Sequence, residues 1–450
     1  MDLMEKLTIL GDAAKYDVSC ASSGLDRSSG NAKGKGIGNS MACGICHTWT
    51  EDGRCVSLLK VLMSNACCYD CAYCTNRKSN DVPRASFTPS ELAELAMEFY
   101  RRNYIEGLFI SSAVVGSPDK TMELFIKTLE ILRFKYYFRG YIHTKIIPGA
   151  SQELVERIGY LADRVSVNAE FATKRSLQLL AGDKEQKGIL RPMEQVSLVK
   201  RENDEDRRKF SRAAAFAPAG QSTQMIVGAT PERDITLLKL ADAFYSRYSL
   251  KRVYYSAYIP LVTNPLLPAV SSLPPMKREH RLYQADWLMR FYGFSVDEIV
   301  DDGNPDLDLM VDPKISYALR HPELFPVEIN TADLELLLRV PGIGVTSARR
   351  IIEARRFGRL DEEGVKKTGV VLKRARFFIT VNGKFRGSCL PDDPVLYDVL
   401  SDGSADYQLS LFDGVDPQRE GVGSSQSSIP PAMIAAYRGG KTEEQHPMLA

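Results

Sequence analysis

The chain has 450 residues, of which 44% are hydrophobic, so it is long enough to build one large domain and a smaller one around buried cores. Its 58 Lys and Arg residues are balanced by 57 Asp and Glu, and the net charge of +1 argues against a chain that binds polyanions over its whole surface. No apolar run approaches the roughly 20 residues needed to span a bilayer, and acidic residues stand where a signal peptide would be positive, so we expect no membrane association and a cytoplasmic location.

Eight of the nine cysteines fall within the first 74 residues, and only Cys389 lies outside. In a reducing compartment such clustering indicates metal or redox chemistry rather than a disulfide framework. Residues 20–55 are rich in Gly and Ser and predict a loop. Residues 1–57 are therefore interpreted as a cysteine-containing N-terminal extension.

Four of these cysteines stand apart from the densest cluster and are enough for a second closed metal site. They are Cys20, Cys43, Cys46 and Cys55, and they include a C-x2-C pair. Such a site would hold an auxiliary iron-sulfur cluster or zinc, and His47 is a candidate to replace one ligand. Free thiols without metal are the alternative.

Strand and helix patterns alternate over residues 58–310. Apolar runs predict strands at 58–64, 107–113, 141–147, 164–169, 223–228 and 251–258, and amphipathic patterns predict helices at 89–102 and 120–133. Strand-helix alternation implies parallel pairing with right-handed crossovers. The expected fold class is therefore α/β, a partial barrel of six strands whose ligands bind at the carboxyl ends of the strands.

The first predicted strand runs directly into the sequence CCYDCAYC, in which Cys67, Cys71 and Cys74 have the spacing C-x3-C-x2-C. Three thiolates on a short loop can ligate three irons of a 4Fe-4S cluster and leave the fourth iron open for a ligand. A structural zinc site is the alternative, although zinc sites more often combine one C-x2-C pair with a distant second pair. Cys68 has no place in the spacing and is interpreted as a small packed side chain.

At these residues the chain resembles the radical S-adenosylmethionine enzymes. The resemblance implies a partial (β/α)6 barrel over residues 58–310, a 4Fe-4S cluster on the three cysteines, and S-adenosylmethionine bound at the open iron and cleaved to a 5′-deoxyadenosyl radical. By analogy, residues at the strand ends would line the cofactor site. They are Ser111, Ser112, Asn168, Glu170 and Gly228. The segment SSAVVG stands where many members carry Gly-Gly-Glu.

A second module is predicted at residues 325–390. The sequence from Glu328 to Arg356 indicates two amphipathic helices joined by a tight Pro-Gly-Ile-Gly turn, and residues 368–379 look like a degenerate second hairpin. From Arg349 to Ser388 there are 12 Lys and Arg against 4 Asp and Glu, a local charge of +8. A helical hairpin used for protein contacts, or a merely solvated basic face, is the alternative.

This module resembles the helix-hairpin-helix motif of DNA-binding proteins. Glycines in the turn allow free amides at the start of the second helix to bind a phosphate oxygen, whatever the base sequence. The candidate DNA-binding residues are Gly342, Ile343, Gly344, Lys373, Arg374 and Arg376. DNA is favoured over RNA as the partner.

Residues 391–450 are interpreted as a flexible tail, disordered towards its C-terminus, because its last 38 residues are rich in Gly, Ser, Pro and Gln. Within it, residues 408–412 resemble the pentapeptide with which bacterial repair proteins bind the replication sliding clamp. The candidate contact residues are Gln408, Leu409, Leu411 and Phe412. An ordinary apolar edge strand is the alternative.

Together, the two modules resemble a family of radical S-adenosylmethionine proteins associated with DNA modification or repair. Some members are encoded beside a uracil-DNA-glycosylase-like partner. The resemblance implies an enzyme that modifies or repairs DNA, with the reaction and catalytic residues unknown. The alternatives are an RNA-modifying radical enzyme and a noncatalytic iron-sulfur adaptor that recruits a glycosylase to DNA.

Overall fold

The computed structural model describes residues 1–14, 45–49 and 55–402. The described chain divides into two compact units. The first contains residues 1–231 and 243–275, and the second contains residues 232–242 and the described residues from 276 onward. The helix α7 (Asp234–Tyr248) contributes residues to both.

The first unit is built on a curled sheet of six parallel strands, β2 to β7, which follow one another in chain order. Their bounds are β2 (Cys55–Leu62), β3 (Gly107–Ser111), β4 (Tyr141–Lys145), β5 (Arg164–Ser166), β6 (Gln221–Val227) and β7 (Arg252–Ala257). Nearly all their side chains are buried, as expected for parallel strands covered by helices. The predicted partial barrel of six parallel strands is confirmed.

A seventh strand, β1 (Ile45–Trp49), pairs antiparallel with the start of β2. The Gly- and Ser-rich composition of residues 20–55 predicts only loop, and this prediction is wrong for residues 45–49. The reason is that β2 begins at Cys55, three residues earlier than predicted, and its extra length offers β1 a partner.

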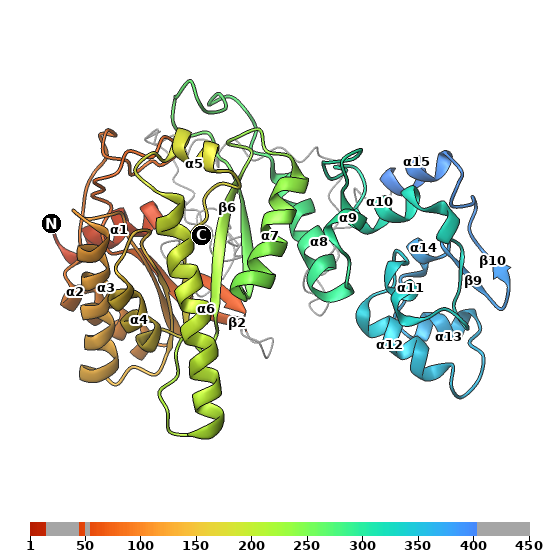
Figure 1. The fold of residues 1–450 in the computed structure, drawn as a ribbon, viewed down its shortest axis with the longest axis horizontal. Helices are drawn as coiled ribbons and strands as arrows, with labels where there is room; N and C mark the ends of the chain where they lie inside the picture. The colour runs from red at the N-terminus through yellow and green to blue at the C-terminus, as the bar shows by residue number, and fades with distance from the viewer. Residues whose placement is uncertain (15–44, 50–54, 403–450) are drawn as a thin grey trace, which may run out of the picture. The chain divides into compact units, whose positions relative to one another are not determined.

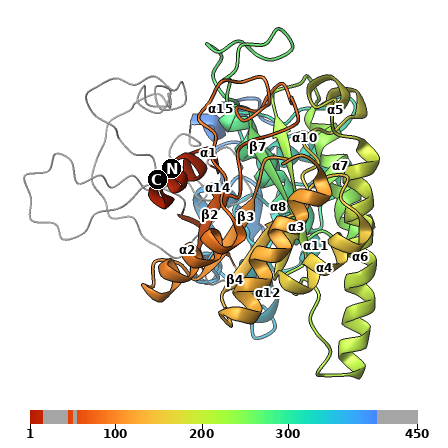
Figure 2. The same ribbon diagram turned by 90° about the vertical axis from the view of Figure 1, so that its left-hand side faces the viewer.

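Helices cover the outer face of the sheet, as Figures 1 and 2 show for α2, α3, α4 and α6. The helical segments of this unit are α1 (Leu3–Ala14), α2 (Pro89–Arg101), α3 (Pro118–Glu130), the π-helical turn η1 (Ile131–Lys135), α4 (Gln152–Leu161), α5 (Lys174–Leu180) and α6 (Gln186–Lys209). The start of α2 is fixed by a capping box, in which Thr88 and Glu91 satisfy each other's backbone amides. The helices between strands lead the chain from the carboxyl end of one strand to the amino end of the next. All six parallel strands therefore end at the same edge of the sheet.

The second unit is mainly helical. Its helical segments after α7 are α8 (Met276–Tyr292), α9 (Val296–Ile299), α10 (Pro313–Arg320), the 3-10 turn η2 (Pro322–Leu324), α11 (Leu334–Arg339), α12 (Val345–Ala354), α13 (Glu362–Lys367), α14 (Leu372–Ala375) and α15 (Val395–Asp402). A small sheet contains β8 (Val327–Glu328), β9 (Ile379–Val381) and β10 (Lys384–Phe385). The helix α15 falls within the segment for which the composition predicts a tail.

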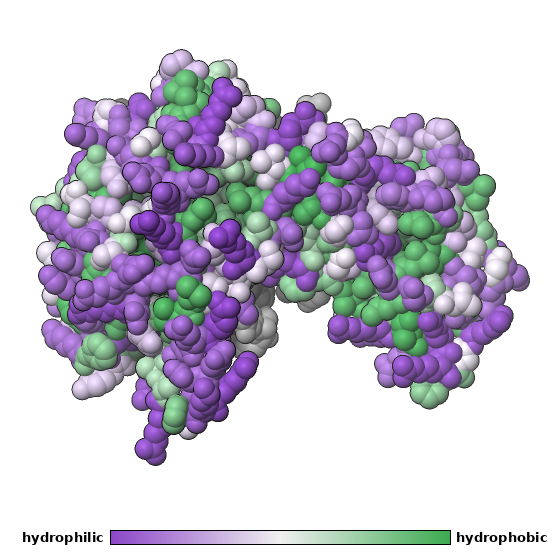
Figure 3. Space-filling model, in the orientation of Figure 1, coloured by the Kyte–Doolittle hydropathy of each residue, from purple (hydrophilic) through white to green (hydrophobic). Residues whose placement is uncertain are grey.

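Hydrophilic side chains dominate the face drawn in Figure 3, and hydrophobic ones gather there in separate patches. Among the residues that the structure describes, no helix is both long and apolar enough to cross a bilayer.

Candidate functional site

The three clustered cysteines lie on the loop that follows β2, at the carboxyl ends of the parallel strands. Backbone hydrogen bonds fix this loop at two points: Cys68 donates to the Val114 carbonyl at 2.9 Å, and Ala72 donates to the Leu180 carbonyl at 2.7 Å. A third bond runs from the Asp70 amide to the Asp183 carboxylate at 2.7 Å. Since these partners come from two other parts of the chain, the segment after β3 and the end of α5 with the loop that follows it, the loop conformation is set by the fold around it.

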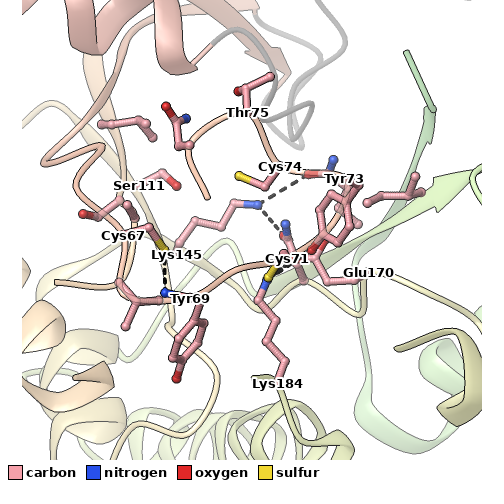
Figure 4. A pocket seen from close by; sticks show the side chains of 18 of the residues that line it. Cys67, Tyr69, Cys71, Tyr73, Cys74, Thr75, Ser111, Lys145, Glu170 and Lys184 are labelled. Carbon is pink, nitrogen blue, oxygen red and sulfur yellow. Dashed lines mark hydrogen bonds and ion pairs between the residues drawn. The ribbon is translucent and has the colours of Figure 1, made fainter. Parts of the chain in front are cut away.

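Cys67, Cys71 and Cys74 line one cavity of about 250 Å³ (Figure 4). Cys71 is buried, and Cys67 and Cys74 are half-buried. Cys68 is exposed, and its thiol lies 3.6 Å from the Gly116 carbonyl oxygen. The structure therefore separates Cys68 from the three spaced cysteines, although its exposure differs from the packed role that the sequence predicts.

The surroundings of Cys71 and Cys74 favour the neutral form of these two thiols in the protein alone. Burial raises the pKa of Cys74 to about 12 and also raises the pKa of Cys71. A metal that binds these thiols has to displace their protons.

The donor set fits an iron-sulfur cluster. A cubane binds each thiolate through a different iron, so its three sulfurs have to line a shared hollow rather than converge on one point. Among the described residues, no three His, Cys, Asp or Glu side chains are placed to hold a single metal ion.

Four of the five residues predicted from the strand ends line the same cavity. They are Ser111, Ser112, Asn168 and Glu170. Gly228 also follows a strand, but it packs against Pro275, where a Cβ would lie 2.6 Å from the proline ring. This glycine has a φ of +84°, so the close approach and the backbone conformation both require the absence of a side chain.

Glu170 is held in an unusual conformation beside a buried cation. Its φ is +63°, in the left-handed region that non-glycine residues rarely adopt. Its carboxylate pairs with the Lys184 ammonium at 2.6 Å, and both side chains are largely buried. Burial is the largest single influence and disfavours the charged lysine, but the Glu170 carboxylate, together with Tyr73 and Cys71, holds the pKa of Lys184 well above its ordinary value. A backbone conformation of this kind costs free energy and persists where the surrounding structure holds the residue in place, as at binding sites.

Several cavity residues are absent from the sequence predictions. Lys145, the last residue of β4, donates to the Asn168 side-chain oxygen and lies 3.5 Å from the Gln224 side-chain oxygen. Lys184 also lies 3.3 Å from the Tyr73 hydroxyl. Lys145 could have been found from the sequence, because a charged lysine stands there at the end of an apolar strand. Lys184 follows α5 in a loop, and no local pattern marks it.

The second group of four cysteines is described only in part. Cys20 and Cys43 lie outside the described residues. Cys46 is buried in a cluster with Val56, Leu58 and Phe109, whereas Cys55 is exposed. In the β1–β2 register, Cys46 is opposite Leu58 and Cys55 is opposite Trp49, so the two cysteines lie on opposite faces of the strand pair. A second metal site remains a prediction that depends on Cys20 and Cys43. His47 belongs to β1, and its role as a ligand stays a prediction.

The second unit places the predicted hairpin between α11 and α12 (Figure 1). Gly342 has a φ of +84°, and a Cβ there would lie 2.7 Å from the Val371 carbonyl oxygen. Gly344 is the N-cap of α12 and offers no side-chain cap, so the first amides of that helix lack an intrahelical acceptor. The side chain of Ile343 is buried, which anchors the turn in the core.

The degenerate second hairpin packs against the first. The Val371 amide donates to the Gly342 carbonyl at 2.9 Å, and Gly369 has a φ of +90° in its own turn. The three predicted cations differ: Lys373 and Arg376 are exposed, whereas Arg374 pairs with Asp312 at 2.9 Å and both side chains are largely buried. Arg374 is therefore held in an internal ion pair.

Comparisons with known proteins give one family match and several structural neighbours. The helix-hairpin-helix motif matches residues 325–362. No curated protein matches the chain. Solved structures that resemble it include the FeFe-hydrogenase maturase HydG from Carboxydothermus hydrogenoformans, with a TM-score of 0.39, 14% identity, and coverage of 51% of this chain and 50% of that one.

Two further structural neighbours have lower TM-scores. Methylornithine synthase (PylB) has a TM-score of 0.37 and 11% identity over 51% of this chain and 60% of its own. The radical S-adenosylmethionine methyltransferase TsrM from Kitasatospora setae has a TM-score of 0.34 and 14% identity over 49% of this chain and 38% of its own. The chain thus spans about half the length of the first solved structures that it matches.

Proposed function

We propose that this protein is a radical S-adenosylmethionine iron-sulfur enzyme that acts on DNA. The observation that carries the proposal is the position of Cys67, Cys71 and Cys74, which line one cavity at the carboxyl ends of six parallel strands. In this proposal, each thiolate would hold one iron of a 4Fe-4S cluster. With S-adenosylmethionine bound, the cluster would supply a 5′-deoxyadenosyl radical for hydrogen abstraction.

The cavity walls offer groups of the right chemistry for S-adenosylmethionine. The Lys145 ammonium would bind the carboxylate, and the Ser111 and Ser112 hydroxyls and the Asn168 amide would bind polar groups of the amino acid or ribose. The Glu170 carboxylate is already neutralised by Lys184, so its part would be to keep the wall rigid. Ile146, Ile147 and Pro148 provide an apolar wall for the adenine.

Action on DNA is supported by the hairpin and its charge. The turn Gly342–Gly344 leaves the amides of the first turn of α12 without intrahelical acceptors, and those that follow Val345 suit a phosphate oxygen. The net charge of +8 over residues 349–388 provides nonspecific attraction to a polyanion. Phosphate contacts of this kind position an enzyme and do not select a base.

Reductive cleavage of S-adenosylmethionine tests the catalytic part. Under anaerobic conditions with dithionite, the wild-type protein should form 5′-deoxyadenosine, and Cys71→Ala should form none. Cys68→Ala is the matched control, because it removes a thiol from the same loop that has no place in the spacing, and it should retain activity. A wild type that holds a full cluster but forms no 5′-deoxyadenosine would support a noncatalytic adaptor instead.

DNA as the substrate is tested by isotope transfer. Deuterium from labelled nucleotides in a duplex should appear in 5′-deoxyadenosine. Transfer from labelled RNA, without transfer from DNA, would favour the RNA-modifying alternative.

The clamp contact remains a proposal, since Gln408, Leu409, Leu411 and Phe412 lie outside the described residues. A peptide with this sequence should capture a bacterial sliding clamp, and the Leu411→Ala, Phe412→Ala peptide should not. A glycosylase-like partner and a cytoplasmic location likewise remain predictions.

A further inference from the structure

The last two turns of α8 expose a pair of aromatic rings that contact each other at a tilt. Trp287 and Phe291 stand four residues apart on one side of the helix, and their ring centroids are 4.2 Å apart at an interplanar angle of 45°. Their exposed fractions are 41% and 45%. The Arg290 guanidinium lies 4.8 Å from the centre of the Phe291 ring. Two large aromatic side chains and a cation thus lie together at the surface of the second unit.

This aromatic pair is connected to the first turn of α12. The Tyr292 hydroxyl lies beside the Val345 backbone amide and the Trp287 side chain. A Cβ built on Gly344, the N-cap of α12, would lie 3.5 Å from that hydroxyl. Tyr292 therefore lies between Trp287 and the hairpin turn.

The buried side chain of Lys314 contacts both the hairpin turn and Tyr292. The Lys314 ammonium donates to the Ile343 carbonyl at 2.6 Å and lies 4.7 Å from the centre of the Tyr292 ring. Both the hairpin turn and Tyr292 thus contact α10 through one side chain. The relative position of the hairpin turn and Tyr292 is therefore set by buried contacts.

A nucleotide offers the two chemical groups that this arrangement can bind together. Its phosphate suits the backbone amides of the hairpin, and its base has two π-faces that stack on aromatic side chains. In an intact duplex the faces of the bases are covered by their neighbours, so the rings would reach only a base that has left the stack. The local charge of +8 over residues 349–388 complements a nucleic acid strand rather than an apolar peptide.

We propose that Trp287 and Phe291 form a stacking platform for an unpaired DNA base next to a phosphate held by the hairpin. The second unit would then prefer single-stranded or locally unpaired DNA to an intact duplex. This inference rests on the proposed DNA binding of the hairpin and adds the kind of DNA that is bound.

Intrinsic fluorescence reports directly on the platform, because the chain has only two tryptophans, Trp49 and Trp287. In full-length protein carrying Trp49→Phe, an unlabelled oligothymidine strand should quench the remaining tryptophan in a saturable manner. A blunt duplex of the same length should bind with much weaker quenching. Binding of the single strand without any change in fluorescence would overturn the platform.

Anisotropy with labelled oligonucleotides measures the contribution of stacking. Loss of stacking by one base lowers affinity by about 1–3 kcal/mol, so the Trp287→Ala, Phe291→Ala protein should bind single-stranded DNA about tenfold to a hundredfold more weakly. Its affinity for a blunt duplex should stay within about twofold. Phe134→Ala is the matched control, because Phe134 is an exposed aromatic residue (66%) of the first unit, outside residues 349–388, and it should bind as wild type does.

Trp287→Phe separates stacking from a polar contact between the indole N–H and Tyr292. This variant keeps an aromatic ring and loses the N–H, so it should retain most of the affinity for single strands. A loss as large as that of the alanine variant would assign the effect to the position of Tyr292 and overturn the proposal.

The outcomes distinguish this inference from the proposed function. Failure of the wild-type protein to bind either form of DNA would refute the DNA-binding function itself. Equal binding of both forms, unaffected by the double variant, would leave the hairpin intact and refute the platform. A change from dimer to monomer in the double variant, with unchanged DNA binding, would show that the rings form an interface between copies of the chain and would also refute the platform.

Discussion

Both units bury charged side chains, and the surroundings of those side chains differ. In the first unit, Lys145, Glu170 and Lys184 line a cavity beside three thiols. In the second unit, Arg339 and Arg374 are enclosed in ion pairs with Glu298 and Asp312 and are tied to neighbouring chain segments. Charged side chains in the first unit therefore line a cavity, whereas those in the second unit are paired internally and hold the chain segments around the hairpin in position.

This contrast is informative about how function is distributed. Arg374 belongs to a basic segment and is predicted to bind DNA, yet its guanidinium forms an internal ion pair with Asp312. A group with no sequence signal, such as Lys184, can lie in the centre of a site. The following variants test the contrast, beginning with the largest expected effect.

Loss of Arg339 should destabilise the second unit most. Its guanidinium donates to both Glu298 carboxylate oxygens, at 2.8 and 3.0 Å, and to the Tyr292 and Gly293 carbonyls. Arg339→Met would leave these acceptors without their donor, at a cost of about 3–5 kcal/mol in the free energy of unfolding. Urea denaturation measures this. Arg386→Met, which breaks an exposed pair with Glu362, should cost less than about 1 kcal/mol, and equal losses would contradict the account.

Loss of Lys184 should cost less, because its partner faces a cavity. Lys184→Met leaves the Glu170 carboxylate uncompensated, and we expect a loss of about 2–3 kcal/mol in the free energy of unfolding. Adding Glu170→Gln should restore part of that stability, since the uncompensated charge is removed. A double variant that is less stable than Lys184→Met would show that the ion pair is not the reason for the loss.

The buried Lys314 should make the stability of the second unit depend on pH. Burial lowers the pKa of Lys314 to about 7, whereas an unfolded lysine titrates near 10.4. Between these values the unfolded chain binds more protons than the folded one, so stability should rise as pH increases from 7. Relative to Lys314→Met, the wild type should gain about 2 kcal/mol between pH 7 and pH 9. Parallel curves for the two proteins in urea denaturation would contradict this prediction.

Loss of one exposed cation near the hairpin should give the smallest effect. Lys373 is exposed, and if it contacts one phosphate, Lys373→Ala should reduce the slope of log K against log salt for duplex binding by about 0.9. The stability of the protein should stay within about 0.5 kcal/mol of wild type. Lys277→Ala, an exposed lysine outside residues 349–388, should leave the salt slope unchanged. An unchanged slope for Lys373→Ala would remove Lys373 from the DNA-binding surface.

Much of the fold could be predicted because its signals are local. Uninterrupted apolar runs mark the parallel strands, and the turn with Gly342 marks a backbone conformation that only glycine adopts easily. The cysteine spacing is likewise contained in eight residues. By contrast, the pairing of Arg374 with Asp312 joins residues 62 positions apart, and Lys184 reaches Tyr73 over 111 positions. Contacts of that range depend on how the elements pack, which local composition and periodicity do not encode.

The strand β1 illustrates the same limit. Residues 45–49 follow a segment whose composition favours loop, and their strand conformation depends on pairing with β2. Likewise, the aromatic pair of α8 has no recognisable motif, and its significance comes from Tyr292, which lies between it and the hairpin turn.

Electron paramagnetic resonance of the anaerobically reconstituted, reduced protein tests the central claim most directly. If three cysteines hold a 4Fe-4S cluster with one iron open, the wild type and Cys68→Ala should give a cluster signal that changes shape when S-adenosylmethionine is added. Cys71→Ala should give no such response. A cluster signal that S-adenosylmethionine leaves unchanged in the wild type, or a protein that takes up one zinc and no iron, would contradict the account.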